Sequence, residues 1–207
     1  MRVIVLANQK GGVGKTTLAG HLGVMAEQRQ AGPVALIDTD PQGSLAAWWN
    51  ERDNESPVFA QADIPKIDDC LVALAQAGMK LAIIDTPPSV TEILRQVLCI
   101  ADLVLIPTRP SPHDLRAVSA TIERVEQAGK TMIFVINGAA PRARIAGEAA
   151  VVLSQYGTVA PVTLYQRTDF ASSMIDGRTV QDRGRSAEEV TSLWTYVSTQ
   201  LSKLPAK

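Results

Sequence analysis

The chain has 207 residues and a mass of 22.2 kDa, with 46% hydrophobic but only 4% aromatic residues. A globular chain of this mass buries about 70% of its extended surface, so one well-filled domain over residues 1–207 is expected, and disorder, collagen and a coiled-coil rod are excluded. Twenty Lys and Arg against 21 Asp and Glu give a net charge of −1 and a pI near 6.1, which excludes a general basic field for holding nucleic acid.

Short β-branched runs alternate with longer amphipathic segments along the whole chain. Strands are predicted at residues 2–7, 34–38, 58–60, 81–85, 103–107, 132–137 and 159–163. Helical patterns separate most of these strands, and one of them covers residues 44–52. This order predicts a single-domain α/β fold, with a mostly parallel, twisted sheet and helices on both of its faces.

The sequence carries no pattern for export or membrane insertion. The first apolar run, residues 3–7, is too short for the core of a signal peptide, and no run reaches the roughly 18 apolar residues that span a bilayer. Cys70 and Cys99 lie in apolar helical stretches without the spacing of a metal site, and we interpret both as core residues in a reducing compartment. A cytoplasmic protein is therefore expected.

Several predicted strands end in a polar residue. Asn8, Asp38, Asp85 and Asn137 each follow the last apolar position of a strand. In open α/β sheets, ligands bind beyond the carboxyl ends of the strands. These four side chains are therefore expected to meet at one crevice.

A glycine-rich loop, Asn-Gln-Lys-Gly-Gly-Val-Gly-Lys-Thr-Thr at residues 8–17, lies between the first strand and the first helix. Its glycines let successive N–H groups turn inward, which makes an anion-binding hollow at a helix N-terminus and predicts a P-loop NTPase. Lys15 would reach the β- and γ-phosphates, Thr16 would bind Mg²⁺, and Thr17 would bond the α-phosphate. The alternative is a glycine-rich turn without a ligand. The nucleotide-binding residues predicted in the loop are Lys10, Gly11, Gly12, Val13, Gly14, Lys15, Thr16 and Thr17.

The loop departs from the usual P-loop pattern at its start. Gln9 stands where the first glycine is expected, and Lys10 opens the glycine run instead. In this the sequence resembles the deviant Walker A ATPases, a class that contains ParA-type partition proteins, MinD and nitrogenase iron protein. The resemblance implies ATP and Mg²⁺ as cofactors, and an ATP-bound homodimer in which Lys10 crosses to the phosphates of the partner subunit. The alternative is that Lys10 is an ordinary solvated loop lysine.

Two carboxylates, Asp38 and Asp40, follow the second predicted strand in the segment Asp-Thr-Asp-Pro-Gln-Gly-Ser at residues 38–44. If the chain is still extended there, residues i and i+2 project to the same side, here toward the phosphates. The resemblance implies that Asp40 positions the attacking water and that Asp38 helps to hold the loop and its lysines. The alternative is a turn that caps the next helix through Asp40 and Ser44. The predicted catalytic residues are Lys10, Lys15, Asp38 and Asp40.

Two further strand ends complete the predicted site. Asp85 closes the strand at residues 81–85, before a Thr-Pro-Pro turn, in the manner of a Walker B carboxylate. It is expected to hold Mg²⁺ through water, because Mg²⁺ gives up its hydration shell reluctantly. Asn137 lies where the base pocket is expected and would read adenine; alternatively, it caps a turn before Gly138. The predicted metal residues are Thr16, Asp40 and Asp85.

The resemblance extends over nearly the whole chain and is strongest to small ParA proteins without an N-terminal helix-turn-helix. Because the glycine-rich loop follows so soon after Met1, no DNA-reading domain is expected before it. Residues 142–185 hold six arginines and no lysine, and the resemblance implies that the ATP-bound dimer binds DNA non-specifically through this region. A solvated surface is the alternative. The candidate DNA-binding residues are Arg167, Arg178, Arg183 and Arg185.

These features together predict a slow ATPase that dimerises on ATP, coats DNA and moves a plasmid, a chromosome segment or another cargo. A centromere-binding or cargo-adaptor protein is the expected partner that stimulates hydrolysis, and the ATP-bound form is expected on the nucleoid. The alternative is a MinD-like ATPase that cycles on a membrane. It is disfavoured because the apolar positions 193, 197, 201 and 204 are interpreted as core, with few basic residues opposite them, so no stable membrane association is expected.

Overall fold

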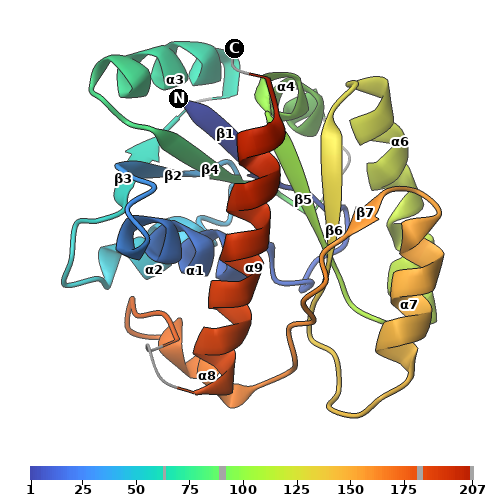
Figure 1. The fold of residues 1–207 in the computed structure, drawn as a ribbon. Helices are drawn as coiled ribbons and strands as arrows, with labels where there is room; N and C mark the ends of the chain where they lie inside the picture. Colours follow the sequence, from blue (N-terminus) through green and yellow to red (C-terminus); the bar gives the residue numbers. More distant parts are fainter. Residues whose placement is uncertain (63, 89–91, 181–183, 206–207) are drawn as a thin grey trace.

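The computed structural model describes residues 1–62, 64–88, 92–180 and 184–205 (Figure 1). Within these residues, seven strands form one sheet in the order β3-β2-β4-β1-β5-β6-β7, and every neighbouring pair is parallel. This confirms the predicted α/β fold. The strands are β1 (Arg2–Leu6), β2 (Val34–Asp38), β3 (Val58–Gln61), β4 (Leu81–Asp85), β5 (Leu103–Thr108), β6 (Thr131–Ile136) and β7 (Thr158–Val159).

Helices cover both faces of the sheet, as predicted (Figure 1). The core is divided accordingly, with α1, α2 and α9 packed on one face and α3, α4, α6 and α7 on the other. Successive side chains of a strand point to opposite faces, so Ile4 and Leu6 join the first cluster while Val3 and Val5 join the second. The helices are α1 (Lys15–Gln28), α2 (Ser44–Asn50), α3 (Ile67–Gln76), α4 (Glu92–Ile100), α5 (Pro112–Ala117), α6 (Ser119–Gln127), α7 (Ile145–Ser154), α8 (Thr168–Ser173) and α9 (Arg185–Lys203), with a 3-10 turn at Ile64–Lys66.

The glycine-rich loop leaves the sheet at its centre. β1 pairs with β4 on one side and with β5 on the other. The last residues of neighbouring strands lie side by side, with Asp85 opposite both Leu6 and Asp38. Because all the strands are parallel, their carboxyl ends share one edge of the sheet, where ligands of open α/β folds bind.

The last predicted strand is much shorter than expected. β7 contains only Thr158–Val159, whereas residues 159–163 were predicted. It lies at the edge of the sheet, and Pro161, which has no N–H group to donate, follows it closely. The helix predicted at residues 44–52 likewise ends earlier, at Asn50.

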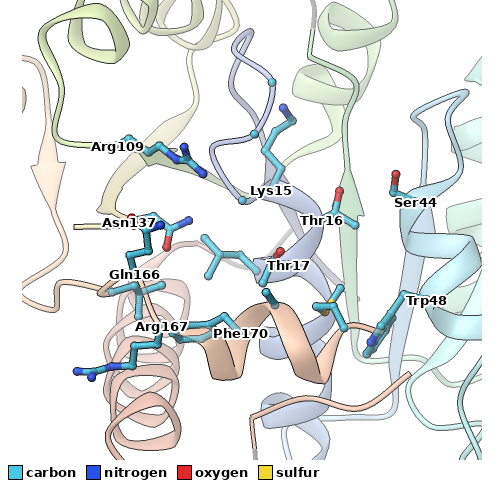
Figure 2. Close-up of a pocket in the computed structure, with 18 of the residues that line it drawn as sticks. Lys15, Thr16, Thr17, Ser44, Trp48, Arg109, Asn137, Gln166, Arg167 and Phe170 are labelled. Carbon is cyan, nitrogen blue, oxygen red and sulfur yellow. The ribbon is translucent and has the colours of Figure 1, made fainter. Parts of the chain in front are cut away.

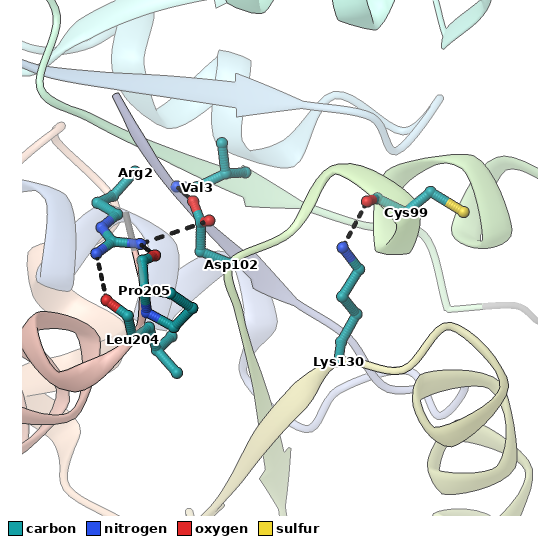
Figure 3. Close-up of polar contacts among 7 residues, drawn as sticks. All are labelled: Arg2, Val3, Cys99, Asp102, Lys130, Leu204 and Pro205. Carbon is teal, nitrogen blue, oxygen red and sulfur yellow. Dashed lines mark hydrogen bonds and ion pairs between the residues drawn. The ribbon is translucent and has the colours of Figure 1, made fainter. Parts of the chain in front are cut away.

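The core prediction for the cysteines is wrong for Cys99, which is exposed, while Cys70 is partly buried. Helix α4 buries Leu94, Val97 and Leu98, which recur at helical spacing on one face. Cys99 follows them on the turn away from that face. Its carbonyl accepts a hydrogen bond of 2.6 Å from Lys130 Nζ (Figure 3).

The last helix packs on the core, and its end is fastened to β1. Leu193, Val197 and Leu201 are buried, as predicted. Arg2 donates hydrogen bonds of 2.7 Å to the carbonyls of Leu204 and Pro205, which provides partners for groups just beyond the helix end (Figure 3). In the described part of the chain, none of the helices reaches the length and apolar character that a bilayer crossing requires.

Candidate functional site

The loop between β1 and α1 has the backbone of an anion site. Gly12 and Gly14 have φ angles of 72° and 95°, in the left-handed region that glycine adopts without strain. Gly14 is the N-cap of α1 and provides no side-chain cap. The first N–H groups of α1 are therefore available to an anion, and the helix dipole favours negative charge there.

The side chain of Lys15 is hydrogen-bonded to carbonyl groups of its own loop. Its Nζ donates to the carbonyl of Asn8 over 2.9 Å and to the carbonyl of Lys10 over 3.3 Å. The residue is only 6% exposed, and burial lowers the pKa of Lys15, against the raising effect of the nearby carboxylates of Asp85 and Asp40. The lysine is thus pre-positioned at the phosphate end of the site.

Lys10 points elsewhere. Its Nζ lies 3.4 Å from Oδ2 of Asp114 in the first turn of α5, and its side chain is 39% exposed. Its backbone N–H donates to Oδ1 of Asn8 over 2.9 Å. Lys10 is therefore an ion-paired residue in this structure, not a freely solvated one.

Thr16 and Asp85 meet behind the loop. Thr16 Oγ1 donates to Asp85 Oδ2 over 2.5 Å, Asp85 is 0% exposed, and its Oδ1 has no hydrogen-bond partner among the described residues. Burial, opposed by the Thr16 hydrogen bond, raises the pKa of Asp85 to about 7. A hydroxyl beside a buried carboxylate with a spare oxygen offers the hard oxygen ligands that Mg²⁺ prefers, so these residues fit the predicted metal.

The described residues contain no cluster of three or more His, Cys, Asp or Glu side chains arranged to hold a metal ion. A site built on Thr16 and Asp85 is of a different kind. Magnesium ions at nucleotide sites use one or two protein ligands, and take the others from phosphate oxygens and water.

Asp38 caps helix α2. Its Oδ2 accepts hydrogen bonds from the N–H groups of Leu45 (2.9 Å) and Ala46 (3.1 Å), and its Oδ1 accepts one from Asp40 N (3.0 Å). Gly43, with φ of 64°, turns the chain so that the start of α2 faces back to the strand end. The carboxylate of Asp38 is thus turned to the helix. The expectation that both acids point toward the phosphates is wrong for Asp38, and so is a cap formed by Asp40 and Ser44.

Asp40 lies on the wall of the cavity described below. Its Oδ1 accepts a hydrogen bond of 3.0 Å from Gln42 N, which forms an Asx-type turn. The turn and a place on the cavity wall therefore coexist at this residue. The two carboxylates of the segment have different structural tasks, although they stand two residues apart.

One cavity of about 1240 Å³ lies beyond the carboxyl ends of the strands (Figure 2). Asn137 and Arg109 stand on one side of the loop, and Ser44 and Trp48 stand on the other. The predicted site residues that line the cavity are Gly11, Gly12, Gly14, Lys15, Thr16, Thr17, Asp40 and Asn137. Lys10, Val13, Asp38 and Asp85 do not line it.

Of the four polar strand ends expected at the crevice, only Asn137 lines the cavity. The side chains of the other three form hydrogen bonds within the structure that surrounds the cavity. Asn8 donates to the carbonyl of Pro107 over 2.8 Å and accepts from Lys10 N, Asp38 caps α2, and Asp85 binds Thr16. These side chains form hydrogen bonds with the backbone and hydroxyl groups nearest to them, because buried polar groups need partners.

Asn137 joins the far side of the cavity to the loop. Its Nδ2 donates to the carbonyl of Val13 over 2.6 Å. A Cβ atom on Gly14 would lie 2.2 Å from the same Nδ2, so a larger residue at this position would displace the Asn137 amide. Asn137 thus fixes the loop in this structure, and Gly138 follows with φ of 66° in a turn.

The candidate DNA-binding arginines lie in two places. Arg167 and Arg185 line one hollow of about 560 Å³ together with Arg142, whereas Arg178 lines another hollow. Arg167 pairs with Glu189 at 2.5 Å, and Arg178 pairs with Asp176. Arg185 has no ion pair among the described residues, and Arg183 lies outside them.

The sequence match decides the family. The model of the CobQ/CobB/MinD/ParA nucleotide binding domain matches residues 4–180 of the chain. This chain belongs to that family. As a member with the glycine-rich loop and a Thr16–Asp85 pair that fits Mg²⁺, the protein is an ATPase, with ATP and Mg²⁺ as its cofactors, as predicted.

Two relatives named Maintenance of carboxysome distribution protein A are each 33% identical to this ATPase. The protein of Halothiobacillus neapolitanus aligns over 200 residues, or 90% of this chain and 91% of the relative. That of Gloeobacter kilaueensis aligns over 211 residues, or 98% and 94%.

Solved structures share the fold. MinD of Pyrococcus horikoshii complexed with Mg-ADP has a TM-score of 0.80 at 15% identity, covering 98% of this chain and 99% of its own. A putative plasmid partition protein of Borrelia burgdorferi bound to AMPPNP has a TM-score of 0.76 at 16% identity, covering 96% and 99%.

Several cavity residues of the ATPase were missed by the sequence analysis. Arg109 directly follows β5, so the strand-end rule applied to that strand would have found it. Tyr165 and Gln166 lie several residues after the short β7, so the strand-end rule applied to that strand would not have found them. Trp48 and Phe170 carry no sequence signal for this site, because α2 and α8 reach the same cavity only in the folded chain.

Proposed function

We propose that this ATPase is a positioning protein whose two copies form a homodimer on ATP, bind DNA non-specifically, and are released when a partner protein stimulates hydrolysis. The observation that carries the proposal is the position of Lys10. Lys15 lies inside the cavity of its own chain, whereas Lys10, partly exposed, lines no part of that cavity. A loop lysine outside its own site supports a role at the phosphates of a second copy.

Within each site, the residues of the cavity divide the phosphoryl chemistry between them. Lys15 and the first N–H groups of α1 hold the phosphates, and Asp40 on the facing wall orients the attacking water. Mg²⁺ held near Thr16 and Asp85 would neutralise charge on the transferring group. Asp38 fixes α2 and thereby the segment that carries Asp40. Because this catalysis uses positioning and charge, it needs no covalent intermediate, and slow turnover is expected without the partner.

Non-specific DNA binding would use the hollow that Arg167 and Arg185 line with Arg142. Arginine binds phosphate in a planar fork, and such contacts carry no sequence information. Glu189 already pairs with Arg167, so part of its charge is held within the chain. A dimer brings two such hollows together on one particle and doubles the number of phosphate contacts.

The names of the relatives indicate two kinds of cargo. Two relatives are named for carboxysome distribution, and one solved structure for plasmid partition. We propose a large cargo of either kind, a DNA molecule or a protein compartment, that carries the adaptor which stimulates hydrolysis. A membrane-cycling role is disfavoured because the apolar stripe of α9 is packed in the core.

Co-sedimentation with DNA or with anionic liposomes, in Mg·ATP and in Mg·ADP, tests this proposal. The protein is expected to pellet with DNA in Mg·ATP and not in Mg·ADP. Three phosphate contacts from each of two subunits predict a slope of log K against log salt of about −5. Arg167→Ala with Arg185→Ala should weaken binding and flatten the slope, while the control Arg124→Ala, exposed on α6, should not. Pelleting with liposomes instead, or a salt-insensitive DNA complex, would contradict the proposal.

A further inference from the structure

The carboxylate of Asp114 makes an ion pair with Lys10 that its role at the start of helix α5 does not require. Asp114 stands at the third position of α5, where its N–H donates to Ser111 Oγ over 3.1 Å and its Oδ2 accepts from the same hydroxyl. Ser111 is thus the N-cap of α5, and one oxygen of the Asp114 carboxylate is enough to accept its hydroxyl. Lys10 adds an ion pair of 3.4 Å to Oδ2 from a loop 104 positions earlier in the chain.

The ion pair between Lys10 and Asp114 affects the energy of the folded chain because Asp114 is buried. Asp114 is 6% exposed, and its Oδ1 has no hydrogen-bond partner among the described residues. An ionised carboxylate in such surroundings is costly unless a cation balances it. Lys10 is the cation that the described residues supply within ion-pair distance.

The residue before Lys10 is fastened to the same segment. Gln9 N donates to Thr121 Oγ1 over 3.1 Å, and the amide of Gln9 donates to the carbonyl of Ala117. Three contacts therefore hold the start of the glycine-rich loop against α5 and α6. In this arrangement Lys10 is kept on its own chain.

We propose that Asp114 is a positioning residue that retains Lys10 on its own chain, and that the ATP-bound dimer forms only when Lys10 exchanges this carboxylate for the phosphates of the second copy. The inference rests on the proposed function, which gives Lys10 that crossing role. Asp114 would then set the protein concentration at which ATP drives dimerisation. It would also help to reject ADP, because a diphosphate lacks the γ-phosphate charge that competes with a carboxylate for Lys10.

The decisive variant is Asp114→Asn, which removes the charge and keeps the shape of the side chain. With a non-hydrolysable ATP analogue and Mg²⁺, its dimer should form at lower protein concentration in sedimentation equilibrium. A partly exposed ion pair is worth up to about fivefold in an equilibrium constant, and each dimer breaks two of them, so the dissociation constant should fall by up to about 25-fold. With ADP, the variant should dimerise more readily than the wild type.

Two further variants separate retention of Lys10 from capping. Asp114→Glu keeps the charge and an acceptor for the Ser111 hydroxyl, so it should restore the wild-type threshold. Ser111→Ala removes the cap hydroxyl and keeps the carboxylate, so it should lower thermal stability without easing dimerisation. If Asp114→Asn does not fold, Asp114→Ser supplies the same test with a hydroxyl in place of the amide.

A second measurement tests the ion pair between Lys10 and Asp114 independently of dimerisation. In a double-mutant cycle on the unfolding of the nucleotide-free chain, Lys10→Ala and Asp114→Asn should be non-additive, since both break the same pair. Additive effects would overturn the inference. A wild-type dimer whose threshold Asp114→Asn leaves unchanged or raises would also overturn it, while the proposed function would stand. A wild type that never dimerises with the analogue would contradict the proposed function and the inference together.

Discussion

Thr16 Oγ1 donates a hydrogen bond of 2.5 Å to Asp85 Oδ2, and this joins the first turn of α1 to the end of β4. The hydroxyl satisfies one oxygen of a carboxylate that is 0% exposed, and Oδ1 of Asp85 has no partner among the described residues. A buried carboxylate with a spare oxygen beside a nucleotide site is poised to balance a divalent cation.

Asp85→Asn should therefore separate nucleotide binding from magnesium. The amide has no charge to balance the metal, so hydrolysis should fall by about 100-fold or more, since a bound metal supplies several kcal/mol of charge stabilisation. Calorimetry should show that the variant still binds nucleotide, but that Mg²⁺ no longer increases the affinity. Asp68→Asn, at an exposed position of α3, is the matched control. Full magnesium dependence in Asp85→Asn would show that the metal is held elsewhere.

The two acids after β2 should behave differently when each is replaced by alanine. Asp38→Ala removes the acceptor for three backbone N–H groups, so the free energy of unfolding should fall by about 2 kcal/mol, together with hydrolysis. Asp40→Ala should change the free energy of unfolding by less than about 1 kcal/mol and still abolish hydrolysis. Urea denaturation and phosphate release measure the two effects. The account of this segment would be wrong if Asp40→Ala proved the more destabilising change.

Gly14→Ala should remove nucleotide binding. At φ of 95° an alanine is strained, and its Cβ would lie 2.2 Å from Nδ2 of Asn137, so the Asn137 amide or the loop must shift. A loss of more than about 1 kcal/mol of stability is expected. Gly147→Ala is the control, because Gly147 lies inside α7 with nothing within 4 Å of its Cβ position, and there alanine should stabilise the helix by up to about 1 kcal/mol. Unchanged nucleotide binding by Gly14→Ala in calorimetry would contradict this geometry.

His21 should make the stability depend on pH. Its Nε2 accepts from Val180 N over 3.1 Å, so Nδ1 carries the proton and donates to the Thr17 carbonyl over 2.7 Å. Burial lowers the pKa of His21 to about 4 from 6.5. A histidine whose pKa is lowered by folding contributes stability above pH 6.5 that is lost as the pH falls toward 4, here at most about 3 kcal/mol.

Denaturant titrations between pH 7 and pH 4 check this prediction. His21→Gln, which keeps a donor and an acceptor, should lose that part of the pH dependence. His113→Gln, at an exposed position of α5, should keep it. Equal slopes for wild type and His21→Gln would contradict a neutral buried imidazole.

The sheet and the loop were predictable because their signals are local. Apolar runs such as residues 81–85 show a buried strand directly, and the glycines of residues 11–14 show the loop. The end of β7 was not predictable in the same way, since the edge position of that strand depends on the whole sheet. Cys99 shows a similar limit, because an apolar stretch does not tell which side of α4 faces the core.

The residue types of the site were also predictable, but their partners were not. The spacing of Asp38 and Asp40 suggested one common direction, yet the turn at Gly43 brings the start of α2 onto Asp38. The ion pair of Lys10 with Asp114 joins two segments that only the folded sheet brings together. Contacts of this range follow from topology, and no local pattern encodes them.

Every role assigned to the site depends on the binding of a nucleoside triphosphate with Mg²⁺ by the loop after β1. Isothermal calorimetry of the wild-type chain with a non-hydrolysable ATP analogue and Mg²⁺ tests it most directly, with circular dichroism to establish that the protein is folded. We expect one nucleotide bound per chain, with binding greatly weakened in Lys15→Gln. Folded wild-type protein that takes up no adenine nucleotide, or binds it equally well in Lys15→Gln, would contradict it.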